Sequence, residues 1–209
     1  DVFVPGRSAN THPYKKFAVV HDEFLHDCEP AIVEDLRSLT GELHALGLES
    51  ATVDVSWWRD SFEIYAPIQA WESARIHAGH YKKTPAAIRE RLEWGAGISD
   101  AEIATFRARH AEFRSRLDAL LHQHELLLLP ASPVSRLTIG ADNGPARVRI
   151  LRYTTPFSLG GVPVVTIPGK VGGMQLAAAR EDDESLLNLA ATIGAHRRNL
   201  RHVEAVEQR

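Results

Sequence analysis

The sequence has 209 residues, of which 44% are hydrophobic and 24% charged, as in a globular protein and unlike a disordered chain. Its 24 basic and 27 acidic side chains give a formal net charge of -3, so bulk charge attracts neither nucleic acid nor an anionic membrane. A single cysteine, Cys28, excludes an internal disulfide and a cysteine-based zinc site. No apolar run reaches the roughly 18 residues that a membrane span requires. The low cysteine content suits a reducing compartment, and we expect a cytoplasmic protein.

The first fifty residues predict two strands with a helix between them. Residues 1–16 show no periodicity, and we expect an extended lead-in there. Phe17–Val20 is a short apolar run, typical of a buried strand. Apolar residues then recur every three or four positions from Pro30 to Gly47, which predicts an amphipathic helix. The alternation in Ala51–Trp57 predicts a second strand, parallel to the first because the order strand, helix, strand forms a βαβ unit.

The middle of the chain is predicted to be helical. Phe62–His80 and Pro85–Trp94 are two helical segments, the first with one internal proline. Ser99 and Glu102 stand at the spacing of a capping box, in which each side chain satisfies a free backbone N–H of the other residue. The apolar residues beyond them share one face of a long helix that runs to His124.

Three further strands and a closing helix are expected in the last third of the chain. The strands are Leu126–Leu129, Val162–Ile167 and Met174–Ala178, and the helix is Asp183–Arg197. Since the strands are strongly apolar, we expect cover on both of their faces. The sequence therefore predicts an α/β fold with a mixed, largely buried β-sheet flanked by helices, in one domain over residues 17–209.

Side chains that could carry chemistry are scattered. His77 and His80 stand three residues apart, and His122 and His124 two apart, but no carboxylate stands at the spacing of a third metal ligand. We expect no metal and no cofactor, and a histidine-based metal hydrolase is the weakest alternative. No serine lies in a G-x-S-x-G or S-x-x-K pattern, and the acidic neighbours of Cys28 raise its thiol pKa.

One segment, Tyr153–Pro163, combines two threonines, a serine and two adjacent glycines directly before a predicted strand. Small and hydroxyl-bearing residues at the mouth of a strand can line a polar pocket. Adjacent glycines also allow two backbones to cross closely without a ligand. The residues alone favour neither interpretation.

Four segments along the chain occur in an order that is similar to a known family. They are Leu126–Pro130, Thr155–Val164, the pair Ile167–Gly169 and Gly173–Leu176, and Asp183–Leu187. In this order they resemble a strand that ends in proline, a T-x-P-x-N-x-x-G-x-P-A segment, a V-P-x-G turn with a P-x-G-x-Q-L strand, and a D-E-x-x-L-L helix. These are motifs of the C-terminal half of the amidase signature family, serine hydrolases that cleave carboxamide C–N bonds. The resemblance spans about residues 16–200.

The sequence departs from the family pattern at several points. Ser158 replaces the usual asparagine, Ala131 and Ser132 replace a threonine, and Gly172 and Gly173 replace proline-x-glycine. The family's catalytic serine, cis-peptide serine and lysine lie in the N-terminal half, to which nothing here corresponds. The resemblance therefore implies no catalytic residue in this chain. It implies a substrate-pocket wall formed by these residues: Thr154, Thr155, Pro156, Phe157, Ser158, Gly160 and Gly161.

The resemblance leaves two hypotheses for function. The first is the C-terminal part of an amidase-type hydrolase with a small amide substrate, which works with an N-terminal half on the same or a separate chain. The second is a non-catalytic interaction module, a pseudoenzyme. In both, we expect an exposed sheet edge that a partner or a second copy covers. Ile150, Leu151 and Arg152 provide no carboxylate to hold a substrate amino group, which favours a less polar amide than glutamine.

Overall fold

The computed structural model describes residues 11–207, with the backbone alone at residues 22, 82 and 199–207. Most of the expected lead-in, residues 1–10, lies outside the described residues. Five strands form one sheet: β1 (Lys16–Val20), β2 (Glu49–Val53), β3 (Leu126–Pro130), β4 (Val164–Pro168) and β5 (Gly173–Ala178). Six α-helices occur in the described part: α1 (Pro30–Ala45), α2 (Ser61–Ile76), α3 (Ala86–Gly97), α4 (Asp100–His124), α5 (Gly144–Gly160) and α6 (Asp183–Glu207).

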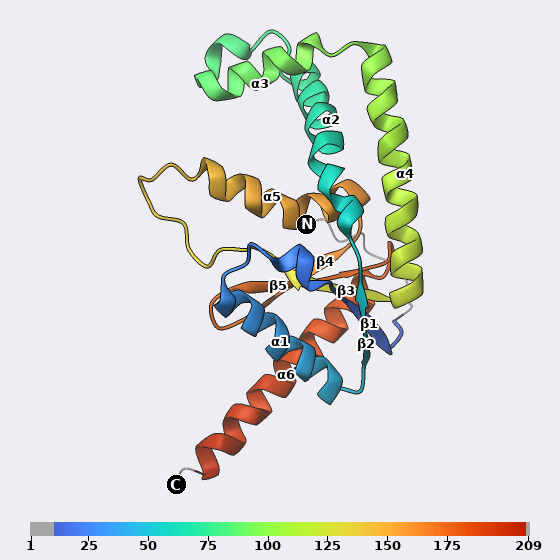
Figure 1. Ribbon diagram of the computed structural model, residues 1–209, viewed down its shortest axis with the longest axis vertical. Helices are drawn as coiled ribbons and strands as arrows, with labels where there is room; N and C mark the ends of the chain where they lie inside the picture. Colours follow the sequence, from blue (N-terminus) through green and yellow to red (C-terminus); the bar gives the residue numbers. More distant parts are fainter. Residues whose placement is uncertain (1–10, 208–209) are drawn as a thin grey trace.

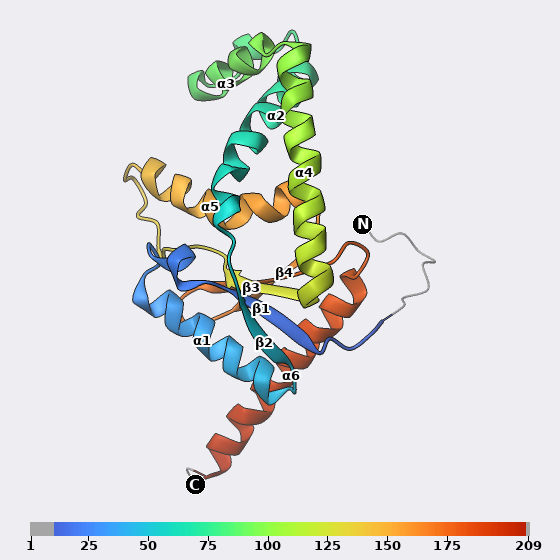
Figure 2. The same cartoon turned by 45° about the vertical axis from the view of Figure 1, so that its right-hand side comes forward.

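The sheet is mixed, with the strand order β2-β1-β3-β5-β4. β1 is parallel to β2 and to β3, which confirms the predicted βαβ unit. β5 is antiparallel to both β3 and β4. Figures 1 and 2 show α1 and α6 against one face of the sheet, and α5 on the opposite face beside the bases of α2 and α4. The predicted α/β fold with a mixed sheet between helices is confirmed.

The centre of the sheet is buried and its two outer strands are exposed. All five residues of β3 are buried, as are five of the six residues of β5. The expectation that Val162–Ile167 is covered on both faces is wrong. The strand runs over Val164–Pro168 at the edge of the sheet, and only Ile167 is fully buried there. A strand with one neighbour has less of the protein around it than a central strand has.

The predicted strand Ala51–Trp57 is displaced toward the N-terminus. β2 ends at Val53, and Ser56–Asp60 forms a 3-10 helix instead. The carboxylate of Asp54 accepts hydrogen bonds from the backbone N–H (2.8 Å) and hydroxyl (2.9 Å) of Ser56. Such a turn around an aspartate competes with the strand ladder and ends it.

Two helices form an arm that leads away from the sheet. In Figures 1 and 2, α2 and α4 run side by side and α3 lies near their far end. The predicted capping box begins α4, where Ser99 N–H donates to Glu102 Oε2 (2.9 Å) and Glu102 N–H donates to Ser99 Oγ (3.2 Å). None of the helices within residues 11–207 is both long and apolar enough to cross a membrane.

Helix α5 was not predicted from the sequence. It contains a proline in its first turn and Pro156 within it, and it ends at two glycines, all residues that usually interrupt helices. The first-turn position tolerates a missing N–H. Gly161 follows the helix in the left-handed conformation (φ 64°), and its N–H donates to the Phe157 carbonyl (2.9 Å). The first half of the T-x-P segment is therefore helical.

Candidate functional site

The side of α5 that faces away from the protein core carries part of the predicted site. Arg147, Leu151, Thr154, Ser158 and Gly161 recur every three or four positions and are exposed or half-buried, and we call them the open stripe of α5. The opposite side of the helix is buried against the rest of the protein. The open stripe is apolar at Leu151 and bears hydroxyl groups at Thr154 and Ser158.

A hollow of about 320 Å³ lies between the C-terminal half of the open stripe and the start of β4. Seven residues line it: Thr154, Phe157, Ser158, Gly161, Val162, Val164 and Gln175. Four of the seven predicted pocket residues are therefore at the hollow. Thr155, Pro156 and Gly160 are buried on the core side of the helix and do not line it. The Thr154 hydroxyl donates weakly to the Ile150 carbonyl (3.4 Å), which leaves its acceptor capacity free.

A buried amide forms the floor of this hollow. Gln175 on β5 is buried, and its Nε2 donates to the carbonyls of Pro130 (3.0 Å) and Tyr153 (3.2 Å). These bonds join the end of β3 to the middle of α5, so the helix is fixed over the sheet. The glutamine is the Q of the P-x-G-x-Q-L resemblance, which was the only sequence signal for its role.

The two adjacent glycines serve different purposes. A Cβ at Gly160 would lie 2.3 Å from Cδ2 of the buried Leu117, so α4 and α5 approach too closely there for a side chain. At Gly161, a Cβ would meet nothing within 4 Å, but the φ of 64° disfavours any other residue. Gly160 is needed for packing, and Gly161 for backbone conformation.

A cluster of charged groups, the Asp27 clamp, attaches α5 to the loop between β1 and α1. The clamp consists of Asp27, Arg149, Arg152 and Tyr153. The Asp27 carboxylate accepts from Arg152, from Arg149 Nε (3.3 Å) and from the Tyr153 hydroxyl (2.7 Å). Burial, and then the hydrogen bond to Asp27, raise the pKa of Tyr153, so it remains a protonated donor. Arg152 is thus committed to a structural ion pair.

Other candidate chemical groups do not assemble into a site. Burial raises the pKa of the Cys28 thiol, and its sulfur lies 3.1 Å from the Tyr153 hydroxyl. A raised pKa opposes nucleophilic reactivity, as the acidic surroundings had predicted. Among the residues that the structure describes, no three His, Cys, Asp or Glu side chains are placed to hold a metal ion together.

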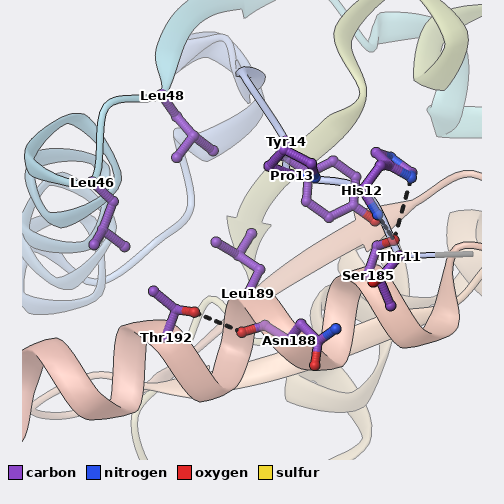
Figure 3. A pocket seen from close by; sticks show the side chains of 10 residues that line it. All are labelled: Thr11, His12, Pro13, Tyr14, Leu46, Leu48, Ser185, Asn188, Leu189 and Thr192. Carbon is purple, nitrogen blue, oxygen red and sulfur yellow. Dashed lines mark hydrogen bonds between the residues drawn. The ribbon is translucent and has the colours of Figure 1, made fainter. Parts of the chain in front are cut away.

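A second hollow, of about 340 Å³, lies between residues 11–14, the end of α1 and the start of α6 (Figure 3). Ser185 Oγ lies 3.3 Å from His12 Nδ1, and His12 Nε2 lies 3.8 Å from an oxygen of Asp182. Serine, histidine and aspartate are the residue types of a catalytic triad, but the geometry is poor. Ser185 is buried and its hydroxyl oxygen already accepts a hydrogen bond from the backbone N–H of His12 (3.1 Å), and the 3.8 Å between His12 and Asp182 is too long for a hydrogen bond. These contacts attach the segment before β1 to α6.

The chain is similar in sequence to curated amidases. No protein-family model matches it. "Putative amidase AmiD" of Mycobacterium tuberculosis is 27% identical over 150 residues, which cover 62% of this chain and 31% of the relative. A glutamyl-tRNA(Gln) amidotransferase subunit of Thermotoga maritima is 24% identical over 211 residues, which cover 85% of this chain and 44% of the relative. The chain thus spans less than half the length of the curated relatives it matches.

Solved structures share its fold. A crystal structure of an amidase superposes on 90% of this chain and 48% of its own, with a TM-score of 0.77 and 24% identity. The structure of 6-aminohexanoate cyclic dimer hydrolase complexed with substrate covers 90% of this chain and 46% of its own, with a TM-score of 0.70 and 17% identity. The protein is an α/β protein structurally similar to amidase signature enzymes. The sequence similarity to the curated relatives indicates homology to the amidase signature family over most of this chain.

Proposed function

We propose that this chain is the C-terminal part of an amidase-type hydrolase that cleaves carboxamide C–N bonds. A nucleophilic serine, its cis-peptide serine partner and a lysine base are supplied by an N-terminal part on the same or a separate chain. The ordered motifs, the homology and the shared fold support this assignment, as does the share of each relative that the chain spans.

The geometry of the hollow beside α5 supports the proposal more specifically than the shared fold does. Residues of the T-x-P segment lie together at a hollow that is open on one side, with Thr154 and Ser158 hydroxyls at its rim and Gln175 beneath. A hydroxyl both donates and accepts, so it can bind the carbonyl oxygen or the departing nitrogen of an amide. The chain thus contributes a positioning wall, and the bond-breaking groups face it from the other part.

The same wall favours a small, weakly polar amide. Leu151 and its neighbour Ile150 line an apolar hollow of about 400 Å³ that continues the open stripe toward the start of α5. Arg147 also lines this hollow, whereas Arg152 is paired with Asp27 and is not available to a substrate. A site built in this way lacks a carboxylate for an amino-acid ammonium group.

The test compares the chain alone with the same chain joined to the N-terminal part of an amidase-type protein, supplied on the same or on a separate chain. The chain alone should hydrolyse no aryl or aliphatic amide, because attack requires an activated nucleophile and an oxyanion-binding site. The joined protein should hydrolyse such amides, and a serine-directed phosphonate should abolish the activity. Hydrolysis by the chain alone would contradict the proposal. A stable complex without hydrolysis would favour the non-catalytic interaction module.

A matched pair of variants tests the wall itself. Thr154→Val removes a hydroxyl at the hollow, and we expect KM for the amide to rise about tenfold in the joined protein, as for one lost hydrogen bond. Thr105→Val is the control, because its hydroxyl likewise donates to the carbonyl four residues earlier (3.2 Å) but lies on exposed α4. Equal effects of the two variants would exclude a substrate contact at Thr154.

A further inference from the structure

The hollow between residues 11–14, the end of α1 and the start of α6 lies apart from the proposed pocket wall (Figure 3). Helices α1 and α6 cover one face of the sheet, whereas α5 lies on the opposite face (Figures 1 and 2). The volume of about 340 Å³ falls within the range of small-molecule sites, which begins at about 300 Å³. It equals the liquid volume of about eleven water molecules and suits a ligand of roughly ten non-hydrogen atoms.

The walls of this hollow are largely apolar. Leu48 and Tyr14 are buried there, and Leu46 and Leu189 are half-buried. Figure 3 shows Leu189 pointing from α6 toward Leu48 and Tyr14. Among the described residues that line the hollow, none is Asp, Glu, Lys or Arg. Since a charged group loses hydration when it is buried without a partner, these walls favour an uncharged ligand with an apolar body.

Two polar side chains at the hollow keep hydrogen-bonding groups free. His12 and Ser185 bond each other, because Ser185 Oγ accepts from the His12 backbone N–H (3.1 Å) and lies 3.3 Å from Nδ1. The Thr192 hydroxyl donates to the Asn188 backbone carbonyl (2.9 Å), which leaves its oxygen free to accept. Asn188 is exposed, and none of the described residues bonds its side-chain amide. That amide and the Thr192 oxygen stand one helical turn apart on α6.

These free groups match the end of a primary carboxamide. The ligand carbonyl can accept from the Asn188 amide N–H, while one ligand N–H donates to the Asn188 side-chain carbonyl. The second ligand N–H can donate to the Thr192 oxygen. A carboxylate offers only acceptors and an ammonium group only donors. A trans peptide bond directs its N–H and C=O to opposite sides, so it cannot exchange both bonds with one side-chain amide.

We propose that the hollow between α1, α6 and residues 11–14 binds a small primary carboxamide with an apolar body. The carboxamide group bonds Asn188 and Thr192, and the body packs on Leu48 and Leu189. The inference rests on the lining of this hollow and not on the function proposed above. With that function, the protein has amide sites on two faces of the sheet. The amide is bound here without cleavage, because the buried Ser185 is bonded to His12.

The chemical class is tested with four probes that share one ring. Benzamide, benzoate, benzylamine and N-methylbenzamide differ only at the polar end, and each is titrated into the chain alone by ligand-observed NMR. Benzamide should bind with a dissociation constant in the millimolar range, as expected for so small a ligand. The other three should bind at least tenfold more weakly, as for two lost hydrogen bonds. Equal binding of benzamide and benzoate would overturn the proposal.

The location is tested by substitution. Asn188→Leu removes the amide at similar volume and should weaken benzamide binding about tenfold. Gln123→Leu is the matched control, because Gln123 is an exposed side-chain amide on α4, and it should leave binding unchanged. Thr192→Val removes the acceptor one turn away and provides a second variant if Asn188→Leu fails to fold. Thr154→Val, at the hollow beside α5, should not change benzamide binding.

The outcomes separate this site from the activity. Benzamide binding that Asn188→Leu and Thr192→Val leave unchanged would overturn the site, and binding lost in Thr154→Val instead would place the amide beside α5. Binding that depends on Asn188, in a joined protein that hydrolyses no amide, would support the site and contradict the proposed function. Hydrolysis by the joined protein, without binding that depends on Asn188, would support the function and overturn the site.

Discussion

Removal of the Asp27 carboxylate should destabilise the protein far more than removal of an exposed carboxylate. In Asp27→Asn, the guanidinium groups of Arg149 and Arg152 lose their anionic partner, and the Tyr153 hydroxyl loses a charged acceptor. Asp27 is 19% exposed at its side chain, so solvent cannot fully replace the lost interactions. The Asp27 clamp is the main polar attachment between α5 and the loop after β1.

The expected cost lies between two limits. Breaking a fully buried ion pair costs about 3–5 kcal/mol, and an exposed pair contributes about 0–1 kcal/mol. Because Arg149 and Arg152 are 40% and 26% exposed, we expect about 2–3 kcal/mol. For a chain of this size, one kcal/mol moves the thermal midpoint by about 2–4 °C, so the midpoint should fall by roughly 5–10 °C.

The assay is urea and thermal unfolding followed by circular dichroism, with Glu34→Gln as the matched control. Glu34 and Arg37 form an exposed pair on α1 at 3.6 Å, and its loss should change stability by less than about 0.5 kcal/mol. If Asp27→Asn unfolds at the same midpoint as Glu34→Gln, the clamp does not hold α5 and the reasoning is refuted.

Two further predictions concern α5. Gly160→Ala should cost about 1–3 kcal/mol, because its Cβ would overlap Leu117, and Gly161→Ala about 1 kcal/mol, because of its positive φ. Gly41→Ala in α1 should be neutral or stabilising. Equal urea-unfolding midpoints for Gly160→Ala and Gly41→Ala would contradict the packing role of Gly160. Tyr153→Phe removes the hydroxyl that lies 3.1 Å from the Cys28 sulfur and whose hydrogen bond lowers the thiol pKa, so maleimide should alkylate Cys28 more slowly near neutral pH. An unchanged rate would show that the hydroxyl does not stabilise the thiolate.

Helices and strands whose apolar residues recur at one regular spacing were predictable from the sequence, whereas α5 was not. The helix α4, which Ser99 caps, combines a capping box with apolar residues at regular spacing along its length, so local signals agree with the final structure. In α5, Pro156 and the terminal glycines contradict the helix locally. Contacts with distant segments, such as the bonds of Arg152 to Asp27 and of Gln175 to Tyr153, fix its position. Such contacts are invisible to a periodicity argument.

The candidate site could likewise be predicted only in part. The predicted pocket residues lie on a helix, which divides them between two sides, so Thr154 and Ser158 reach the hollow while Thr155 is buried. A loop interpretation of this stretch predicts no such division of its residues between two sides. The exposure of β4 could not be predicted either, because the order of strands depends on pairing across the whole sheet, and an apolar strand has the same composition at an edge as at the centre.

The turn before β5 gives a last prediction, on the pH dependence of stability. Burial by itself raises the pKa of Asp35, but backbone N–H donors at Val171 (2.8 Å), Lys170 (2.9 Å) and Gly172 (3.0 Å) outweigh it and lower the pKa. A lowered pKa means that Asp35 stabilises the fold above its unfolded pKa of about 4, and that this contribution is lost as pH falls through the lower folded value.

Asp35→Asn should therefore cost about 2 kcal/mol at pH 7, since the three donors then face a neutral acceptor. The difference in free energy of unfolding from the unchanged chain should shrink steadily below pH 4. Urea unfolding of both proteins between pH 7 and pH 3 measures it. A difference that stays constant over this range would mean that the charge of Asp35 does not hold the turn. Since the turn joins β4 to β5, the variant should also accelerate deuterium exchange at Val165, whose N–H faces β5.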